Sequence, residues 1–416
     1  MKSDHLKRAA RRLVLRLEEL GRISDEPRKL TRTFLSPAMH RANVLVDWWM
    51  RSAGLRTRVD ATGNLIGRRE GPRPDAKTLL FGSHLDTVRD AGRFDGALGV
   101  LLPILALAEL RRRGVVLPFA VEVIGFSEEE GVRFSSAYLG SKGYTGRLRA
   151  GDLWRRDAEG VSVREALEKY RRGRFSLPKP AHRPSNLLGY LEVHIEQGPV
   201  LEAKGLSVGV VSAIAGQTRG RLTMRGQAGH AGTTPMALRR DALAGAAELV
   251  LAAEAQARLS SPLVATVGTI MVAPGAANVI PGEVTLSLDV RHPDDAGRHA
   301  ALEKLLASAG RIARRRKLTC QWTQTQDDGA VVCSPELTGL LSSSVRAVQQ
   351  RSVALVSGAG HDAVVMSAIT PVAMLFVRCR DGLSHHPDEQ ASPGDLEVAL
   401  RVTVDFLERF ARKSSS

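Results

Sequence analysis

Residues 78–96 read TLLFGSHLDTVRDAGRFDG and pass from an apolar run into a cluster of polar residues. The apolar start of this stretch, 78–81, indicates a buried strand that ends in polar residues. The apolar stretch 97–110 that follows is too short to span a membrane and indicates a buried helix, and a second apolar run occupies 119–126. Strands that alternate with helices predict an α/β fold with a mainly parallel sheet covered on both faces.

The pattern changes at about Gly216, where Arg219, Arg221, Thr223 and Arg225 alternate with apolar or small residues as in a half-buried strand. The elements expected after it are helix 235–257, strands 263–271 and 283–290, helix 295–313 and strand 318–323. This order predicts a small sandwich of one sheet and two helices. Buried-strand patterns return at 353–355 and 371–377. We therefore expect a discontinuous domain, 1–215 with 326–416, and an inserted domain, 216–325.

The composition is that of a globular protein with excess positive charge. Of 416 residues, 43% are hydrophobic and 25% charged, and 59 Lys and Arg against 44 Asp and Glu give a net charge of +15. This charge favours anionic ligands, but it also fits a solvated, arginine-rich surface. Aromatic residues are only 4% of the chain, which argues against a nucleic-acid binder that stacks bases. Three scattered cysteines fit a reducing compartment, and we expect a cytoplasmic protein that contacts no membrane.

Two polar residues lie where the first predicted strand ends and the next helix begins. His84 follows the apolar run and Asp95 precedes the helix. In an open α/β sheet both lie at the edge where ligands bind. Asp86 can orient His84, as carboxylates commonly do for metal-binding imidazoles. A metal site is one interpretation, and a turn with a helix cap is the other.

Glu128, Glu129 and Glu130 directly follow the second apolar run. Adjacent carboxylates repel one another unless a cation or a raised pKa relieves the repulsion. The strand before them points to the same sheet edge as His84, which favours a shared cation over a solvated acidic loop. Histidines also stand beside carboxylates in 192–199 and 384–389.

Nine motifs, in order along nearly the whole chain, resemble those of the metal-dependent amidohydrolases of the M20 peptidase superfamily. They are GSHLDT (82–87), GRFDGALG (92–99), EEEGVRF (128–134), EVHIEQGPVLE (192–202), GHAGTTPM (229–236), NVIPGEV (278–284), DVR (289–291), SGAGHDA (357–363) and SHHPDE (384–389). The branch resembled contains allantoate amidohydrolases, N-carbamoyl-L-amino acid hydrolases and β-ureidopropionases. The resemblance implies a catalytic domain of the M20 metallopeptidase type, an inserted α+β sandwich that acts as lid and dimerisation domain, and a homodimer.

The resemblance also implies two divalent metal ions per subunit. The matching ligand positions are His84, Asp95, Glu130, His194 and His385. Asp95 matches the bridging carboxylate and Glu129 the general base, while Glu128 receives no direct role. His386 competes for the last ligand position, but the x-Pro-x-Glu pattern that follows selects His385. Imidazole and carboxylate ligands suit Mn²⁺ and Zn²⁺ alike, and the resemblance favours Mn²⁺.

Substrate contacts are implied in both predicted domains, at Gln197, His230, Asn278, Arg291, Gly360 and His361. His230 matches a histidine that the lid presents to the developing oxyanion, commonly across a dimer interface; a turn histidine is the alternative. Arg291 is the expected partner of a substrate carboxylate, because a guanidinium binds a carboxylate through two parallel hydrogen bonds. The alternative for Arg291 is a surface ion pair with Asp289 or Asp294.

Within the branch, residues 31–37, 215–219 and 376–380 look like the allantoate-cleaving subgroup. The implied reaction cleaves a ureido C–N bond of allantoate in purine degradation and yields ammonia, CO2 and ureidoglycine. N-carbamoyl-L-amino acid hydrolysis and β-ureidopropionase activity are the alternatives, since those substrates also carry a ureido group and a carboxylate.

The EEEGVRF and HIEQGP motifs disfavour an aminopeptidase. A protein that binds nucleic acid or another acidic ligand on a hydrolase scaffold is a distant alternative, because no nucleic-acid-binding motif is found.

Overall fold

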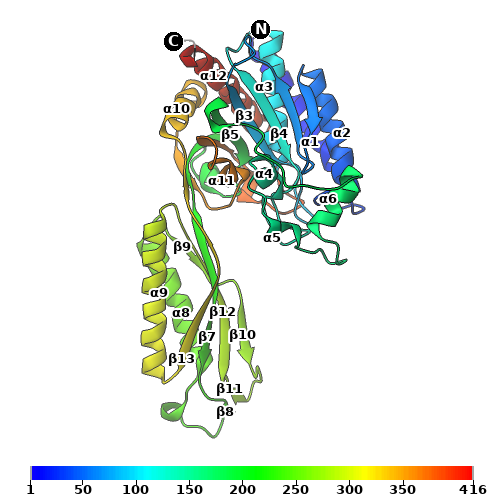
Figure 1. Ribbon diagram of the computed structural model, residues 1–416. Coiled ribbons are helices and arrows are strands. Elements are labelled where there is room, and N and C mark those ends of the chain that lie inside the picture. Colours follow the sequence, from blue (N-terminus) through cyan, green and yellow to red (C-terminus); the bar gives the residue numbers. More distant parts are fainter. Residues whose placement is uncertain (1, 415–416) are drawn as a thin grey trace. The chain divides into compact units, whose positions relative to one another are not determined.

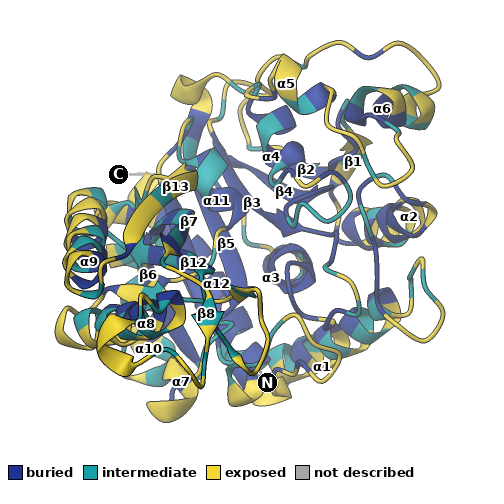
Figure 2. Ribbon diagram, turned by 90° about the horizontal axis from the view of Figure 1, so that it is seen from below, coloured by how far each residue is buried: buried dark blue, intermediate teal, exposed yellow. Residues whose placement is uncertain are grey.

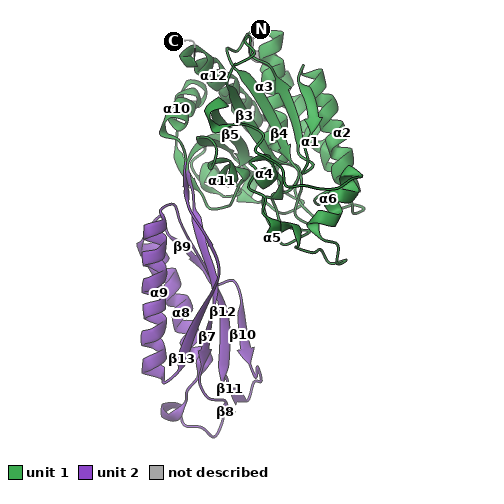
Figure 3. Ribbon diagram, viewed as in Figure 1, with its two compact units in different colours: residues 1–212, 333–416 green, residues 213–332 purple. Residues whose placement is uncertain are grey.

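The computed structural model describes residues 2–414. The chain forms two compact units, residues 1–212 with 333–416 (unit 1) and residues 213–332 (unit 2), as Figure 3 shows. Unit 2 extends beyond the predicted inserted domain, 216–325, at both ends. The physical reason is strand pairing: β14 (Val331–Val332) pairs with residues 213–214 of β6 (Val208–Ile214). Within residues 2–414, no helix combines the length and the apolar character needed to cross a membrane.

Unit 1 is built on a large mixed sheet whose centre is parallel (Figure 1). In spatial order its strands are β1 (Arg56–Val59), β2 (Leu65–Arg69), β4 (Ala120–Phe126), β3 (Thr78–His84), β5 (Leu187–Ile195), β16 (Val372–Val377) and β6 up to Ser212, and β15 (Ala354–Ser357) also pairs with β6. The end of β6 and β14 belong to unit 2. The four strands β4, β3, β5 and β16 run parallel to one another, while β2 and β6 pair antiparallel to them. The predicted α/β fold with a mainly parallel core is confirmed.

Helices cover the sheet of unit 1. The longer ones are α1 (Lys2–Gly21), α2 (Pro37–Ser52), α3 (Ala97–Arg112), α10 (Pro335–Gln349) and α12 (Pro393–Ser414). The shorter ones are α4 (Leu139–Tyr144), α5 (Ala150–Leu153), α6 (Val163–Arg171), α7 (Val200–Ala203) and α11 (Asp362–Met366). In Figure 2, α3 and the central strands are buried, whereas the outer faces of α1 and α2 are exposed. The predicted buried helix at 97–110 is therefore confirmed, and Pro103 lies inside it.

Unit 2 is a sandwich of one sheet and two helices, and this part of the predicted fold is also confirmed. Its sheet has the order β10 (Ile270–Ala273), β12 (Glu283–His292), β7 (Gly216–Arg225) and β13 (Thr319–Asp328), with β9 (Val264–Thr266) also paired to β12. Helices α8 (Ala242–Leu259) and α9 (Asp295–Arg316) pack on this sheet around buried residues such as Leu249, Leu286 and Ile312. A separate two-stranded ribbon joins β8 (Gly229–His230) to β11 (Val279–Ile280).

Two predicted elements of unit 2 differ from those observed. The helix predicted over 235–257 begins only at Ala242, because Asp241 accepts hydrogen bonds from the backbone N–H groups of Leu243 and Ala244 and caps the helix there. The single strand predicted over 263–271 is wrong. Both β9 and β10 pair with β12, but the ladder is interrupted between Thr266 and Ile270, where the N–H groups of Gly268 and Thr269 bind the side-chain hydroxyl of Ser287 in β12.

The start of α2 carries a local sequence signal, a capping serine, Ser36, followed by a proline, Pro37, at the first helical position. The Ser36 hydroxyl accepts a hydrogen bond of 3.1 Å from the backbone N–H of Met39. We expect Ser36→Ala to lower the free energy of unfolding by about 1 kcal/mol, because that N–H loses its partner. Urea unfolding of the two proteins measures this difference. Equal midpoints and slopes would show that the cap contributes nothing.

Candidate active site

The candidate site lies at one edge of the unit 1 sheet. Parallel strands end on the same side, and the register pairs His84 with Phe126 and Val377 with Ile195. The polar segments that follow β3, β4, β5 and β16 therefore all start at this edge, where open α/β sheets bind ligands. His194 lies one residue before the end of β5, and its ring centroid is 5.8 Å from that of His84.

Asp95 lies between the imidazole groups of the cluster. Its Oδ1 is 3.0 Å from His194 Nε2 and 3.6 Å from His84 Nε2, and its Oδ2 is 3.2 Å from His385 Nε2. His385 Nε2 is also 3.6 Å from Glu130 Oε1. Three sets of side chains each offer ligand atoms within 4.8 Å of one another: His84, Asp95 and His194; His84, Glu129 and Glu130; and Asp95, Glu130 and His385. The two oxygens of Asp95 thus face different ligand groups.

The hydrogen bonds of two histidines indicate which nitrogen faces the carboxylate as an acceptor. His194 Nδ1 is 2.9 Å from the carbonyl oxygen of Ile195, and His84 Nδ1 is 2.9 Å from that of Asp86. In a neutral ring, Nδ1 then donates its proton and Nε2 keeps a lone pair. Among the described residues, Asp95 Oδ1 and His194 Nε2 are buried without a hydrogen-bond partner. Two acceptors that face each other need a cation or a proton between them, and this donor set fits a divalent metal ion.

Burial acts on the pKa values of the carboxyl groups in the same cluster. It raises the pKa of Glu129 well above its usual range and that of Glu130 to about 7. Burial also acts to raise the pKa of Asp95, but contacts with His194, His385 and His84 outweigh it and hold that pKa well below its usual range. Because a metal ion favours deprotonated carboxylates and neutral imidazoles, a metal ion bound here would displace protons from these groups.

Two further carboxylates, Asp86 and Glu128, hold the loop that carries Glu129 and Glu130. Asp86 accepts hydrogen bonds from the backbone N–H groups of Glu129, at 3.0 Å, and Glu130, at 3.2 Å. Glu128, which received no direct role, accepts from the N–H groups of Gly131 and Leu139 and so shapes the same loop. These contacts orient the side chains on this loop.

Sequence reasoning missed Glu389. Its Oε1 accepts from the backbone N–H of Phe94, at 2.8 Å, and of Asp95, at 3.1 Å, while the Ser384 hydroxyl donates to its Oε2 at 2.9 Å. The carboxylate therefore ties the Asp95 loop to the His385 loop. Its signal was the last letter of the SHHPDE motif. His385 Nε2 faces Asp95 Oδ2, whereas His386 Nδ1 lies 3.7 Å from Asp388 Oδ2.

The other predicted contacts in unit 1 lie beside the cluster. Gln197 Nε2 donates to Asp95 Oδ2 at 3.3 Å and to the Ser384 hydroxyl at 3.2 Å. His361 is buried, and its ring centroid is 4.5 Å from that of His194. Gly360 precedes it at a place where the Tyr138 hydroxyl leaves no room for a side chain. Direct contact of His361 and Gly360 with a substrate stays a prediction.

His230, Asn278 and Arg291 belong to unit 2. The backbone N–H of Ala231 donates to the Asn278 carbonyl, so His230 and Asn278 lie together on the β8–β11 ribbon. His230 is exposed, and its Nδ1 accepts from the N–H groups of Gly232 and Thr233 at 3.1 and 3.2 Å. The neutral ring therefore carries its proton on Nε2, which is left as a hydrogen-bond donor.

Arg291 shows the pairing with Asp289 that the sequence left open. Its Nε and Nη2 donate to Asp289 Oδ1 and Oδ2 at 2.8 and 2.9 Å. Asp289 also accepts from Arg219 at 2.7 Å. A substrate carboxylate would have to share the Arg291 guanidinium with Asp289. The contact between Arg291 and a substrate carboxylate stays a prediction.

A parallel sheet edge that gathers imidazoles and carboxylates around one shared aspartate is typical of metal-dependent hydrolases. The chain belongs to Peptidase family M20/M25/M40, whose family model matches residues 80–409. It is 43% identical to Allantoate deiminase 2 of Glycine max, over 96% of this chain and 89% of the relative. It is 40% identical to N-carbamoyl-L-amino acid amidohydrolase of Geobacillus stearothermophilus, over 94% and 96%. An amidase of the hydantoinase/carbamoylase family from Burkholderia multivorans has a TM-score of 0.90 and 34% identity, over 96% of this chain and 97% of that one.

Glu129→Gln separates the proposed roles of two adjacent glutamates. We expect the variant to bind metal as the parent does and to lose turnover by on the order of 10²–10⁴-fold, because glutamine cannot accept a proton. Metal analysis of the purified variant and steady-state rates measure both quantities. Loss of metal in Glu129→Gln would mean that Glu129 is a ligand and that its role has been exchanged with that of Glu130.

Proposed function

We propose that the protein hydrolyses a ureido C–N bond of allantoate, releases ammonia and CO2, and gives ureidoglycine. One observation carries this proposal: the two carboxylate oxygens of Asp95 face different sets of potential metal ligands. Relatives named allantoate deiminase, 43% identical over nearly the whole chain, support the choice of substrate. The activity belongs to purine degradation, and we propose a cytoplasmic homodimer as its form.

The proposed metal ligands are His84, Asp95, Glu130, His194 and His385, with Asp95 shared between two ions. When bound, the metal ions supply Lewis acidity at the attacking water and the scissile carbonyl. Mn²⁺ is the proposed metal and Zn²⁺ the alternative, because imidazole and carboxylate ligands suit both.

Protein side chains transfer the proton of the attacking water and stabilise the negative charge that develops on the carbonyl oxygen. Glu129 accepts the proton of the attacking water and delivers it to the leaving nitrogen. Its burial suits this task, because a raised pKa makes the carboxylate a stronger proton acceptor. His230 Nε2–H donates to the oxyanion, and we propose that it acts in the site of the partner subunit. Gln197, Asn278, Gly360 and His361 are the further proposed substrate contacts.

N-carbamoyl-L-amino acid hydrolysis is the second candidate. It is favoured by the relative with that name, whose 40% identity is only slightly below that of the allantoate deiminases. Both kinds of substrate present a ureido group to the metals and a carboxylate to Arg291. The residues of the proposed site therefore fit either substrate, and β-ureidopropionase activity is a variant of the same chemistry.

A substrate panel after metal exchange tests the proposal. We expect chelation to abolish activity and Mn²⁺ to restore it better than Mg²⁺, because Mg²⁺ prefers oxygen ligands in octahedral geometry. With Mn²⁺, ammonia release from allantoate should exceed turnover of ureidoglycolate, N-carbamoyl amino acids and 3-ureidopropionate. Full activity in the metal-free protein would contradict the metal mechanism. Preferred turnover of an N-carbamoyl amino acid would transfer the assignment to the second candidate.

Arg291→Lys tests the proposed reading of the substrate carboxylate. Lysine keeps the charge but cannot make two parallel hydrogen bonds, so we expect weaker substrate binding. The loss of binding free energy, roughly 2–5 kcal/mol, should lower kcat/KM and leave the metal content unchanged. Arg225→Lys is the matched control, because Arg225 also pairs with an acid across this sheet, Glu283. Unchanged kcat/KM for Arg291→Lys would leave Arg291 as the surface partner of Asp289 alone.

A further inference from the structure

Arg32 is a buried cation that binds backbone carbonyls. Its side chain is 1% exposed. Nε donates to the carbonyl oxygen of Leu85 at 2.5 Å, and Nη1 donates to those of Leu20 and Ile23 at 3.1 Å each. Burial lowers the pKa of Arg32 to about 10, against the opposing effect of Asp86 and Asp25, so the guanidinium stays charged at neutral pH. A charged group is costly to bury, and an apolar side chain could fill the same space without that cost.

The backbone of Arg32 binds the same turn as its side chain. Its N–H donates to the Thr87 hydroxyl at 2.9 Å, and the N–H of Thr87 donates to its carbonyl oxygen at 2.9 Å. Together with the bond to Leu85, these contacts hold the turn 85–87 from both ends. The bonds to Leu20 and Ile23 tie the same guanidinium to the end of α1.

Asp86 lies at the centre of this turn. Its carbonyl oxygen is 2.9 Å from His84 Nδ1, and its carboxylate accepts from the N–H groups of Glu129 and Glu130. A displacement of the turn would therefore change the direction of the His84 ring and move the loop that carries two of the proposed site residues. Arg32 itself contacts none of these side chains through its three hydrogen bonds, so its effect on them is indirect.

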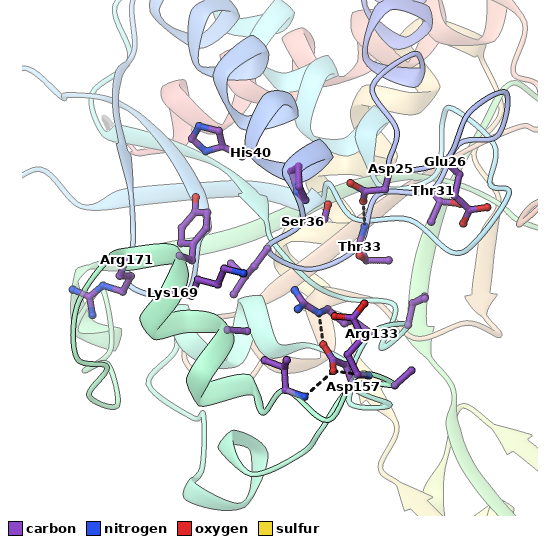
Figure 4. A pocket seen from close by; sticks show the side chains of 18 of the residues that line it. Asp25, Glu26, Thr31, Thr33, Ser36, His40, Arg133, Asp157, Lys169 and Arg171 are labelled. Carbon is purple, nitrogen blue, oxygen red and sulfur yellow. Dashed lines mark hydrogen bonds and ion pairs between the residues drawn. The ribbon is translucent and has the colours of Figure 1, made fainter.

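The neighbours of Arg32 face a different space. Thr31 and Thr33 line a cavity of about 1180 Å³ in unit 1, together with Ser36, Arg133 and others (Figure 4). Arg32 is not among the lining residues and is directed into the protein. We therefore expect a substitution of Arg32 to act on the turn 85–87, which its hydrogen bonds contact, and not on the lining of this cavity.

We propose that Arg32 is a positioning residue of the metal centre: it fixes the turn 85–87 and, through Asp86, the orientation of His84 and of the Glu129–Glu130 loop. This inference rests on the proposed function, because it assigns those residues to a metal site. Residues that orient metal ligands commonly change metal affinity by about 10–100-fold when they are replaced.

Release of Mn²⁺ to an excess of chelator, followed without substrate, tests the proposal. We expect Arg32→Lys to release Mn²⁺ about tenfold faster than the parent, because lysine keeps the charge but cannot bind three carbonyls in the geometry of the planar guanidinium. With allantoate, kcat should fall more than KM changes. The chemical control is Arg298→Lys: Arg298 is also 1% exposed, and its partners Asp295, Asp327 and Asp328 belong to unit 2.

Two further variants separate positioning from general loss of stability. Leu341→Ala destabilises the core of unit 1 at a fully buried position of α10 and should keep the parent's release rate. Thr87→Val keeps the branched shape but removes the acceptor of the Arg32 N–H, so it should accelerate release even where Arg32→Lys fails to fold.

The outcomes distinguish the two proposals. If the parent protein binds neither Mn²⁺ nor the alternative Zn²⁺, the proposed function fails and this inference fails with it. If the parent binds Mn²⁺ and the Arg32→Lys and Thr87→Val variants release it at the parent's rate, only the positioning role is overturned. Equal acceleration by Leu341→Ala or Arg298→Lys would likewise overturn it, because the effect would then follow stability and not the turn.

Discussion

The close approach of Asp95 Oδ1 and His194 Nε2, at 3.0 Å inside the protein, is the constraint on which the site depends. The bond from His194 Nδ1 to a backbone carbonyl leaves two acceptors face to face. Such a pair is unfavourable in the protein interior unless positive charge lies between its members. The remaining imidazoles and carboxylates lie around the same aspartate, so one cation would relieve only part of the cluster.

The fold provides this arrangement through parallel strands. His84 and His194 belong to strands far apart in the chain, and pairing of β3 with β4 and β5, and of β5 with β16, brings the ends of all four to one edge. Backbone hydrogen bonds then fix the loops beyond the strands. Asp86 holds the Glu129–Glu130 segment, and Glu389 holds the start of the Asp95 loop. Because these contacts are made to N–H groups, each carboxylate orients the side chains of the residues it binds.

Local signals in the sequence predicted much of this structure. The apolar run 97–110 predicted a buried helix, and Ser36 before Pro37 is the signal for the start of α2, because both features depend on neighbouring residues. The motifs identified residues that the structure brings together around Asp95. Arg32 and Glu389 were not assigned a role, since the contacts that link them to the site, with the Leu85 carbonyl and the Phe94 N–H, are made to backbone groups 53 and 295 residues away and leave no local pattern. The break in strand 263–271 was missed for the same reason, because it depends on a hydroxyl of β12. The choice of Arg291 partner stayed open, as a substrate carboxylate and Asp289 attract a guanidinium alike.

We propose that two metal ions share Asp95. Anomalous diffraction from crystals of the Mn²⁺-loaded protein measures the positions of these ions. We expect two anomalous peaks at the edge of the unit 1 sheet, each next to a different carboxylate oxygen of Asp95, with His194 beside one and His385 beside the other. A single peak, or two peaks that do not share Asp95, would contradict this proposal.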